Sequence, residues 1–376
     1  MIKRILYTLL IMFPVVASAQ INTDRVMAIG RNALYFEDYV LSIQYFNQVI
    51  NAKPYLSDPY FYRGLAKINL DDFQGAESDC SEAIERNPFV VSAYQVRGLA
   101  RIQQNNFAGA IEDYTKALEF DPENIGVWHN MALCRIRQED YKGAKNDLDK
   151  LIAISPRYTK AYLMRGEVDL KQKDTLAAEK DFGKAIEIDR YDADTWASRA
   201  ILRLQQQRYK DAEADFDHAI RLSTRNSGVY INRALARYHQ NNLRGAMSDY
   251  DIALDIDPNN FIGHYNRGLL RAQVGDDNRA IQDFNFVIEM EPDNMMAIFN
   301  RGLLLDQTGD YKGAIKDYST VINEYPNFLL GYQYRAQARR KIGDVKGADA
   351  DEFKVLKTQL DKQNGVDPNK QTADNT

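Results

Sequence analysis

Residues 107–122 read "FAGAIEDYTKALEFDP", and this pattern returns along the chain at a fixed interval. It appears 34 residues earlier as "FQGAESDCSEAIERNP" (73–88) and 34 residues later as "YKGAKNDLDKLIAISP" (141–156). A constant period of this length indicates an array of similar structural repeats, each packed on its neighbours. The phase fits ten repeats without an insertion, which begin at residues 23, 57, 91, 125, 159, 193, 227, 261, 295 and 329.

Each repeat contains two segments with apolar residues at helical spacing. In the repeat that begins at Val91, the first segment (helix A) carries Tyr94 and Gly98, and the second (helix B) begins at Phe107. The residue before helix B is Asp or Asn in nine repeats, which suits a helix N-cap, with Arg208 as the exception. In seven repeats a proline follows helix B and ends it. Each repeat is therefore predicted to be a helical hairpin.

Small and aromatic residues recur at two places of the repeat, where a residue's place is its position from 1 to 34. Place 8 is Gly or Ala in all ten repeats, although Gly inside a helix costs ~1 kcal/mol relative to Ala. Place 24 is aromatic in seven repeats. We expect the aromatic ring to fill the volume that the missing side chain leaves, so that the two helices approach closely. Much of the Tyr content, 23 residues, is then core.

A small residue at place 8, an aromatic at 17, Ala at 20, an aromatic at 24, a small residue at 27 and Pro at 32 resemble the tetratricopeptide repeat, here of an exported bacterial type. The resemblance covers residues 23 to about 356. It implies an all-α, right-handed superhelical solenoid of ten 34-residue helix-turn-helix repeats, with helix A lining the concave face. One departure is place 11, where the family often has Tyr and this chain usually has Lys or Arg.

The first 20 residues, "MIKRILYTLLIMFPVVASAQ", have the order of a secretory signal peptide. Lys3 and Arg4 precede twelve apolar residues and a small-residue cleavage site, and the apolar core is too short to span a bilayer of ~30 Å. A buried N-terminal strand would not explain these features together. We expect cleavage between Ala19 and Gln20, and a protein of the periplasm or cell envelope, or one that is secreted.

The predicted organisation is a signal peptide at 1–19, a short lead at 20–22, the solenoid at 23–362 and a disordered tail at 363–376. A net charge of −5 gives no electrostatic footprint for nucleic acid, and no later stretch approaches the 18 apolar residues of a transmembrane helix. Cys80 and Cys134 lie in repeats 2 and 4. An intervening hairpin should separate them by more than the ~7 Å that a disulfide allows, so we expect two free thiols, with Cys80 buried and inert.

The sequence carries no motif for catalysis, a metal or a cofactor. The four histidines lie at different places of four repeats, without metal-ligand spacing. No G-x-S-x-G or H-E-x-x-H motif appears, and nothing marks a pair of catalytic carboxylates. We therefore expect a protein that is not an enzyme and needs no cofactor.

Arg at place 7 and Asp at place 23 occur together in eight repeats, which predicts an ion pair between helix A and helix B. A row of anion-binding arginines is the alternative, but each arginine has its own matched acid. Repeat 1 has Ile29 and Tyr45 instead, and repeat 4 has Met131 beside Asp147. The predicted pairs are Arg63–Asp79, Arg97–Asp113, Arg165–Asp181, Arg199–Asp215, Arg233–Asp249, Arg267–Asp283, Arg301–Asp317 and Arg335–Asp351.

Apolar residues at places 5, 9 and 12 of helix A point to a partner-binding surface, because proteins of the family contact their partners from the concave face. The alternative is that neighbouring A helices pack these side chains against one another, and place 5 is expected to be the more open. The candidate contact residues are Phe61, Leu65, His129, Leu163, Ile231, Tyr238, Tyr265, Phe299 and Leu303.

These features predict a non-catalytic scaffold in the cell envelope that binds a peptide or protein in a concave groove. An envelope glycan-binding protein that uses groove aromatics is the alternative. At the C-terminal end, Asp349 and Glu352 predict a polar capping helix, which argues against end-to-end fibres.

Overall fold

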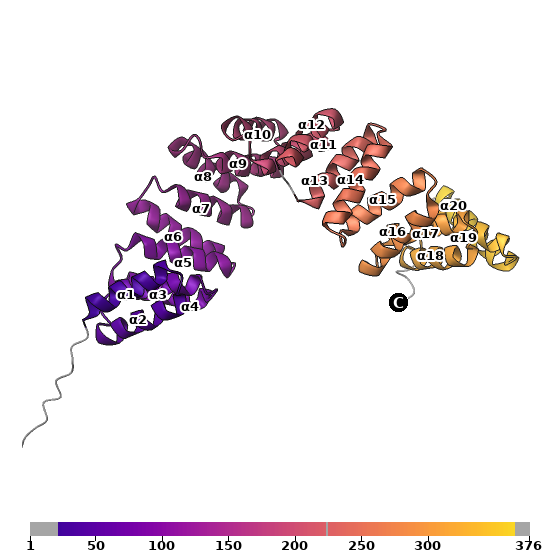
Figure 1. Cartoon of the computed structure of the whole chain (residues 1–376). Coiled ribbons are helices and arrows are strands. Elements are labelled where there is room, and N and C mark those ends of the chain that lie inside the picture. Colours follow the sequence, from indigo (N-terminus) through magenta and orange to yellow (C-terminus); the bar gives the residue numbers. More distant parts are fainter. Residues whose placement is uncertain (1–21, 223–224, 365–376) are drawn as a thin grey trace, which may run out of the picture. The chain divides into compact units, whose positions relative to one another are not determined.

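The structure, a computed structural model, describes residues 22–222 and 225–364. These residues form twenty helices and no strand, so the predicted all-α fold is confirmed (Figure 1). The chain divides into two compact units, Met1–Lys184 and Ala185–Thr376. The predicted signal peptide and residues 365–376 of the predicted tail lie outside the described residues.

Every repeat contributes two consecutive helices, as predicted. The A helices are α1 (Thr23–Tyr35), α3 (Asp58–Ile68), α5 (Val91–Gln103), α7 (Ile125–Arg137), α9 (Thr159–Lys171), α11 (Ala193–Gln205), α13 (Ser227–His239), α15 (Phe261–Gln273), α17 (Met295–Gln307) and α19 (Leu329–Lys341). The B helices are α2 (Tyr39–Ala52), α4 (Phe73–Arg86), α6 (Phe107–Phe120), α8 (Tyr141–Ile154), α10 (Thr175–Ile188), α12 (Tyr209–Arg221), α14 (Leu243–Ile256), α16 (Asp277–Met290), α18 (Tyr311–Glu324) and α20 (Val345–Gln363).

A residue in the left-handed region, at place 15, ends helix A in every repeat. Its φ is +59° to +64° in the seven repeats that have another residue there and +79° to +92° at Gly275, Gly309 and Gly343. Asp or Asn at place 16 then accepts a hydrogen bond from the third backbone N–H of helix B in eight repeats. Asp276 departs from the prediction, because its side chain makes no cap bond and pairs with Arg279 at 2.7 Å.

The two helices of a repeat meet where place 8 faces place 24. A Cβ atom added to Gly302 would lie 2.9 Å from Cε1 of Tyr318, and one added to Gly166 would lie 2.5 Å from Cε1 of Phe182. Real Cβ atoms do not approach carbon this closely, because the interior is packed to crystal density. The predicted packing role of the small residue is confirmed.

A second recurrent glycine, at place 19, makes room for the helix cap, a role that the sequence did not reveal. The N–H of Gly313 donates to Oδ1 of Asp310 at 3.0 Å, and a Cβ there would lie 2.5 Å from Oδ2 of the same carboxylate. Leu41 and Ala177 occupy this place in two other repeats, and their N–H groups still donate to the capping carboxylates of Asp38 and Asp174, so the carboxylate can also adopt another orientation. The glycines in this setting are Gly75, Gly109, Gly143, Gly245, Gly313 and Gly347.

Neighbouring repeats join by two kinds of contact within each compact unit. Helix B packs on helix A of the next repeat, as α4 does on α5 and α18 does on α19. Successive A helices also touch, as α3 touches α5 and α15 touches α17, so they share one surface, called the helix A surface below. None of the helices in the described part of the chain is long and apolar enough to cross a membrane.

Candidate functional site

The arginine of place 7 binds the aspartate of place 23 in all eight repeats that carry both. In repeat 7, Nη2 and Nε of Arg233 donate to Oδ1 and Oδ2 of Asp249 at 2.6 and 2.9 Å. Asp249 is 1% exposed. This two-pronged geometry occupies the guanidinium fork, so the arginines are part of the scaffold and do not form an open row for anions.

Seven of these eight arginines also bind a residue of the preceding repeat. Nη1 of Arg233 donates to Asp217 at 2.7 Å, and Nη1 of Arg97 donates to Oγ of Ser81 at 3.1 Å. The acceptor stands at place 25 of the preceding helix B, where Asn, Ser and Asp alternate. The acceptors are Asn47, Ser81, Asp149, Asp217, Asp251, Asn285 and Ser319. Each such arginine therefore ties three helices together.

The basic residue at place 11, a departure from the family pattern, is the second cation on the same buried acid. Nη1 of Arg237 donates to Oδ2 of Asp249 at 2.9 Å, and Nη1 of Arg271 donates to Asp283 at 2.8 Å. Two cations beside one carboxylate offset the free-energy cost of removing it from water. The second cations are Lys67, Arg101, Arg203, Arg237, Arg271 and Arg339. Arg135 stands at the same place and binds Asp147.

Repeat 4 lacks one cation of this cluster, because Met131 takes place 7. Asp147 is 5% exposed and faces only Arg135, whose Nε lies 2.7 Å from Oδ2. Burial raises the pKa of Asp147 to about 6 against the attraction of Arg135. Asp283 of repeat 8 is opposed by burial too, but hydrogen bonds from His264 and Arg267 outweigh it and lower its pKa.

A pair of opposite polarity joins repeats 4 and 5. At two other junctions the place-11 cation meets an acid at place 21 of the preceding helix B: Arg101 meets Glu77 at 2.8 Å and Arg237 meets Glu213 at 2.7 Å. Between repeats 4 and 5 the acid is Asp169 at place 11, and Nζ of Lys145 at place 21 lies 2.5 Å from its Oδ1. Because both charges are exchanged, the two places still form an ion pair at this junction.

Most of the candidate contact residues lie half-buried on the helix A surface. The half-buried residues are Phe61, Leu65, His129, Leu163, Tyr238, Tyr265, Phe299 and Leu303. The ring of Phe299 contacts Tyr318, Phe328 and Tyr334, with centroids 5.1 to 5.8 Å apart. The residues at place 5 are therefore partly exposed and partly packed against other side chains.

Ile231 is a correction to the candidate set. It is 6% exposed and packs in a core cluster with Ala234, Tyr250 and Leu270. The side chain of Ile231 packs against the next repeat, where Gly263 has no side chain to exclude it. Ile231 is core and is not available to a partner.

Place 2 of helix A, which the sequence reasoning did not single out, carries exposed apolar residues in repeats 8 to 10. Ile262 is 51% exposed, Met296 66% and Leu330 43%. The first seven repeats have polar, charged or glycine residues at this place: Asp24, Asp58, Ser92, Gly126, Lys160, Asp194 and Gly228. The change at one place of the repeat is the signal that distinguishes the C-terminal repeats.

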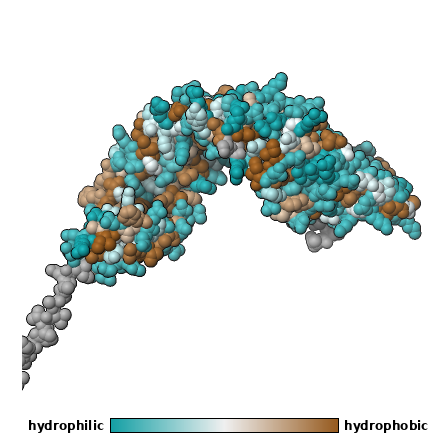
Figure 2. All heavy atoms as spheres, viewed as in Figure 1, coloured by the Kyte–Doolittle hydropathy of each residue, from teal (hydrophilic) through white to brown (hydrophobic). Residues whose placement is uncertain are grey.

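A pocket of about 430 Å³ opens beside this row in repeat 9. Its mainly apolar wall is formed by Met296 and Phe299 from α17, Val321 from α18, and Tyr325 and Phe328 from the loop after α18. Asp293 and Asn294 stand at its rim. Figure 2 shows such apolar patches between hydrophilic side chains on the face in view.

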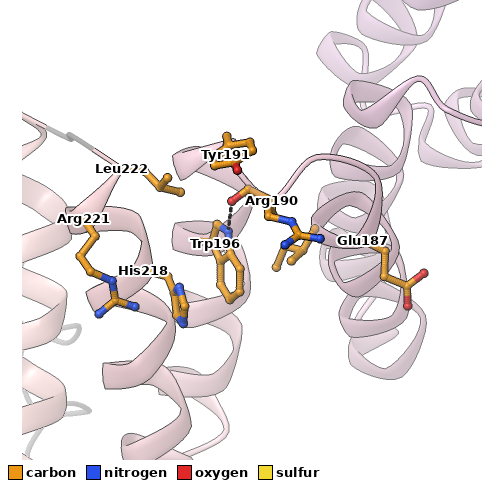
Figure 3. Close-up of a pocket in the computed structure, with 8 residues that line it drawn as sticks. Glu187, Arg190, Tyr191, Trp196, His218, Arg221 and Leu222 are labelled. Atoms are coloured by element: carbon orange, nitrogen blue, oxygen red, sulfur yellow. Dashed lines mark hydrogen bonds between the residues drawn. The ribbon is translucent and has the colours of Figure 1, made fainter.

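A second pocket, of about 450 Å³, lies where repeats 5 and 6 meet, between the end of α10, α11 and the end of α12 (Figure 3). The indole ring of Trp196, at its centre, already contacts other groups of the protein. Nε1 of Trp196 donates to the carbonyl of Arg190 at 3.0 Å, and His218 stacks on the indole with centroids 4.2 Å apart. Trp128 makes the same bond to the carbonyl of Pro122, so this contact is a feature of the repeat.

Both cysteines are free thiols in the core of their repeats, so the predicted burial of Cys80 is confirmed. Burial raises the pKa of Cys80 to about 12 and that of Cys134 to about 11. A thiol that keeps its proton at neutral pH is a poor nucleophile. Among the described residues, no group of three His, Cys, Asp or Glu side chains is placed to hold a metal ion.

Comparison with known proteins agrees with the repeat architecture. Family models of the tetratricopeptide repeat match residues 98–134, 125–158, 159–192, 198–261 and 265–327, which is more than half of the chain. No curated protein matches the chain.

Two solved structures share the fold. A tetratricopeptide repeat protein from Parabacteroides merdae is 21% identical, with a TM-score of 0.51 over 66% of this chain and 98% of that chain. A chain of the APC/C hetero-tetramer Cut9–Hcn1 is 14% identical, with a TM-score of 0.51 over 77% of this chain and 57% of that chain. The chain belongs to the tetratricopeptide repeat family, a non-catalytic scaffold fold that supports protein–protein interaction.

Proposed function

We propose that this protein is an exported scaffold of the cell envelope that binds a peptide or protein through the helix A surface of repeats 8 to 10. In the family this surface corresponds to the concave groove. The proposal of export rests on the order of charge, apolar core and small residues in positions 1–19.

The observation that carries the binding proposal is the pocket of about 430 Å³ at Met296 and Phe299. Met296 stands 66% exposed at its edge, although burying a methionine side chain gains about 1.5–3 kcal/mol. Methionine adapts its shape to different apolar partners. We therefore assign the pocket to an apolar side chain of the partner, and the row Ile262–Met296–Leu330 to the segment that flanks it.

A photo-crosslinking amino acid at position 296 tests the assignment in the native host. The matched control position is Met290, which is 52% exposed on helix B of repeat 8. We expect a partner to crosslink from position 296 and not from 290, and Met296→Ser to weaken binding of that purified partner roughly tenfold or more. Equal crosslinking from both positions would reject the surface.

Localisation is tested separately by fractionation and by N-terminal sequencing of the recovered protein. We expect an envelope or extracellular protein whose first residue is Gln20. A cytoplasmic protein that retains Met1 would overturn the proposed export and leave the partner surface standing.

The glycan-binding alternative is an outcome of the same work. Retention on envelope polysaccharide, with no protein crosslinked from position 296, would replace the protein-scaffold proposal. The engaged indole of Trp196 gives this alternative no support.

A further inference from the structure

Large apolar side chains stand exposed at both ends of the repeat array. In repeat 1, Ile29 is 37% exposed and Phe36 76%. On α20, Val345 is 52% exposed, Phe353 66% and Leu356 56%. The predicted polar capping helix is therefore only partly confirmed, because its outer side carries exposed apolar residues as well as charged ones. Asp349 and Glu352 are present, but both bind Arg340, and the apolar residues beside them face outward.

The junctions inside the chain show which places meet between consecutive repeats. Place 25 of helix B meets place 7 of the next helix A, as Asp217 meets Arg233 at 2.7 Å. Place 17 of helix B meets places 13 and 14 of the next helix A. Nε2 of Gln240, at place 14, lies 3.4 Å from the carbonyl of Tyr209, at place 17, and His239 stacks on the Tyr209 ring at 4.6 Å.

The two end repeats carry apolar residues at all four of these places. Place 25 of the last repeat is Phe353, and place 7 of the first is Ile29. Place 17 of the last repeat is Val345, and place 14 of the first is Phe36. At seven of the nine internal junctions the place-7 residue is an arginine that binds a polar side chain at place 25 of the preceding repeat. The exceptions are Met131 and Arg199, whose place-25 neighbour is Gly183. In the contact between place 25 and place 7, both residues are thus apolar at the ends of the array, whereas they are mostly polar at the internal junctions.

We propose that α20 of one molecule binds repeat 1 of a second copy, in the register that joins repeats within the chain. Phe353 then packs on Ile29, and Val345 packs on Phe36, as a continuation of the repeat-to-repeat interface. The chain's own C-terminal segment is a poor occupant, because residues 365–376 contain Val366 as their one large apolar residue. Such a head-to-tail contact is heterologous, and it leads to rings or open chains of molecules.

One pair of places, 28 and 3, disfavours the proposed contact between molecules and limits its affinity. Place 28 of helix B presses on place 3 of the next helix A, where a Cβ on Gly331 would lie 2.5 Å from Cγ2 of Ile322. The residues at place 3 of repeats 2 to 10 are all buried. Repeat 1 has the exposed Arg25 there, opposite Leu356. We expect Arg25→Ala to strengthen the association.

Analytical ultracentrifugation of the full chain, purified as its host processes it, tests the proposal over a range of concentrations. We expect reversible association beyond the dimer. Ile29→Arg and Phe353→Asp should each weaken it roughly tenfold or more, because each places a charge against an apolar surface. Leu176→Ser, at an 80% exposed residue of α10, is the matched control and should change nothing.

The decisive arm combines the two substitutions. Ile29→Arg with Phe353→Asp recreates the pair of Arg233 and Asp217, so the double variant should associate more tightly than either single variant. Circular dichroism and thermal melts check that the variants are folded. A chain that stays monomeric at all concentrations would overturn the proposal. A dimer that resists Ile29→Arg would also overturn it, since α20 would then pair with α20.

Discussion

Repeats 4 and 8 bury an aspartate at the same place of the same hairpin, and the two carboxyls behave in opposite ways. Asp147 of repeat 4 faces Arg135 alone and has its pKa raised to about 6. Asp283 of repeat 8 binds Arg267, Arg271 and His264 at 2.8 to 2.9 Å, and its pKa is lowered. The difference arises at places 7 and 4, where repeat 4 has Met131 and Trp128.

The comparison shows that the fold does not need the complete ionic cluster. Both repeats form the same hairpin, because the small residue at place 8 and the bulky residue at place 24 pack in each. The cluster instead sets how strongly each buried acid stabilises its repeat, and at which pH. A buried carboxylate is useful only when enough donors surround it.

Arg267→Met, which gives repeat 8 the composition of repeat 4 at place 7, should have the largest effect. It should cost about 3 kcal/mol at pH 7, because Asp283 loses its two-pronged partner while still buried. Urea denaturation measures the loss, and native-state hydrogen exchange locates it in α15 and α16. The double variant with Asp283→Asn should lose less than the sum of the single losses. Additive losses would show that the two residues do not act as a pair.

Asp147→Asn in repeat 4 should have the opposite sign. The folded-state pKa of about 6 lies above the unfolded value, so the charged carboxyl destabilises the fold above pH 6. Removing the charge should stabilise the protein by about 3 kcal/mol at pH 7, and this gain should vanish as the pH falls from 6 to 4. Thermal melts across this range provide the measurement. A gain that persists at pH 4 would contradict the assignment.

Met131→Arg should complete the cluster of repeat 4. The new guanidinium can reach Asp147 within the repeat and Thr115 at place 25 of repeat 3, as Arg97 reaches Asp113 and Ser81. We expect the pKa of Asp147 to fall below 6 and the stability at pH 7 to rise by about 1 kcal/mol. Carboxyl NMR titration and denaturation follow the two quantities. A loss of stability would mean that the core around Met131, with Val127 and Cys134, outweighs the ion pair.

The helix caps of the same two repeats should give the smallest difference. Asp140 caps α8 by accepting from the N–H of Gly143 at 2.9 Å, whereas Asp276 makes no cap bond to α16. Asp140→Ala should cost about 1 kcal/mol, and Asp276→Ala only a few tenths. Denaturation of the two variants side by side measures this. Equal losses would indicate that Asp276 caps its helix in solution.

Periodicity alone was sufficient to predict the hairpins and their packing. The 34-residue phase aligned Gly302 with Gly166 and Tyr318 with Phe182, so the contact between places 8 and 24 followed without coordinates. The Asp or Asn before helix B likewise predicted nine caps, of which eight form. Asp276 failed because its helix carries Arg279 at the third position, and that side chain takes the carboxylate.

Contacts between repeats were harder to predict, because the period does not show which places of neighbouring repeats meet. Arg233 was matched to Asp249 by co-occurrence, but Asp217 was missed because the residue type at place 25 varies from repeat to repeat. The burial of Ile231 was missed for the same reason, as it depends on the next repeat. Met296 and the pocket beside it were found only from exposure.

The exchanged charges of Lys145 and Asp169 bear on how such an array can grow by gene duplication. A repeat inserted beside a copy of itself brings a place-21 and a place-11 residue that must suit its new neighbours. Moved behind repeat 2, repeat 5 would set Asp169 against Glu77, and moved ahead of repeat 3, repeat 4 would set Lys145 against Arg101. Repeats 4 and 5 therefore keep their ion pair only if they are duplicated together. A recombination between them would lose the Lys145–Asp169 contact, which the 34-residue period does not reveal.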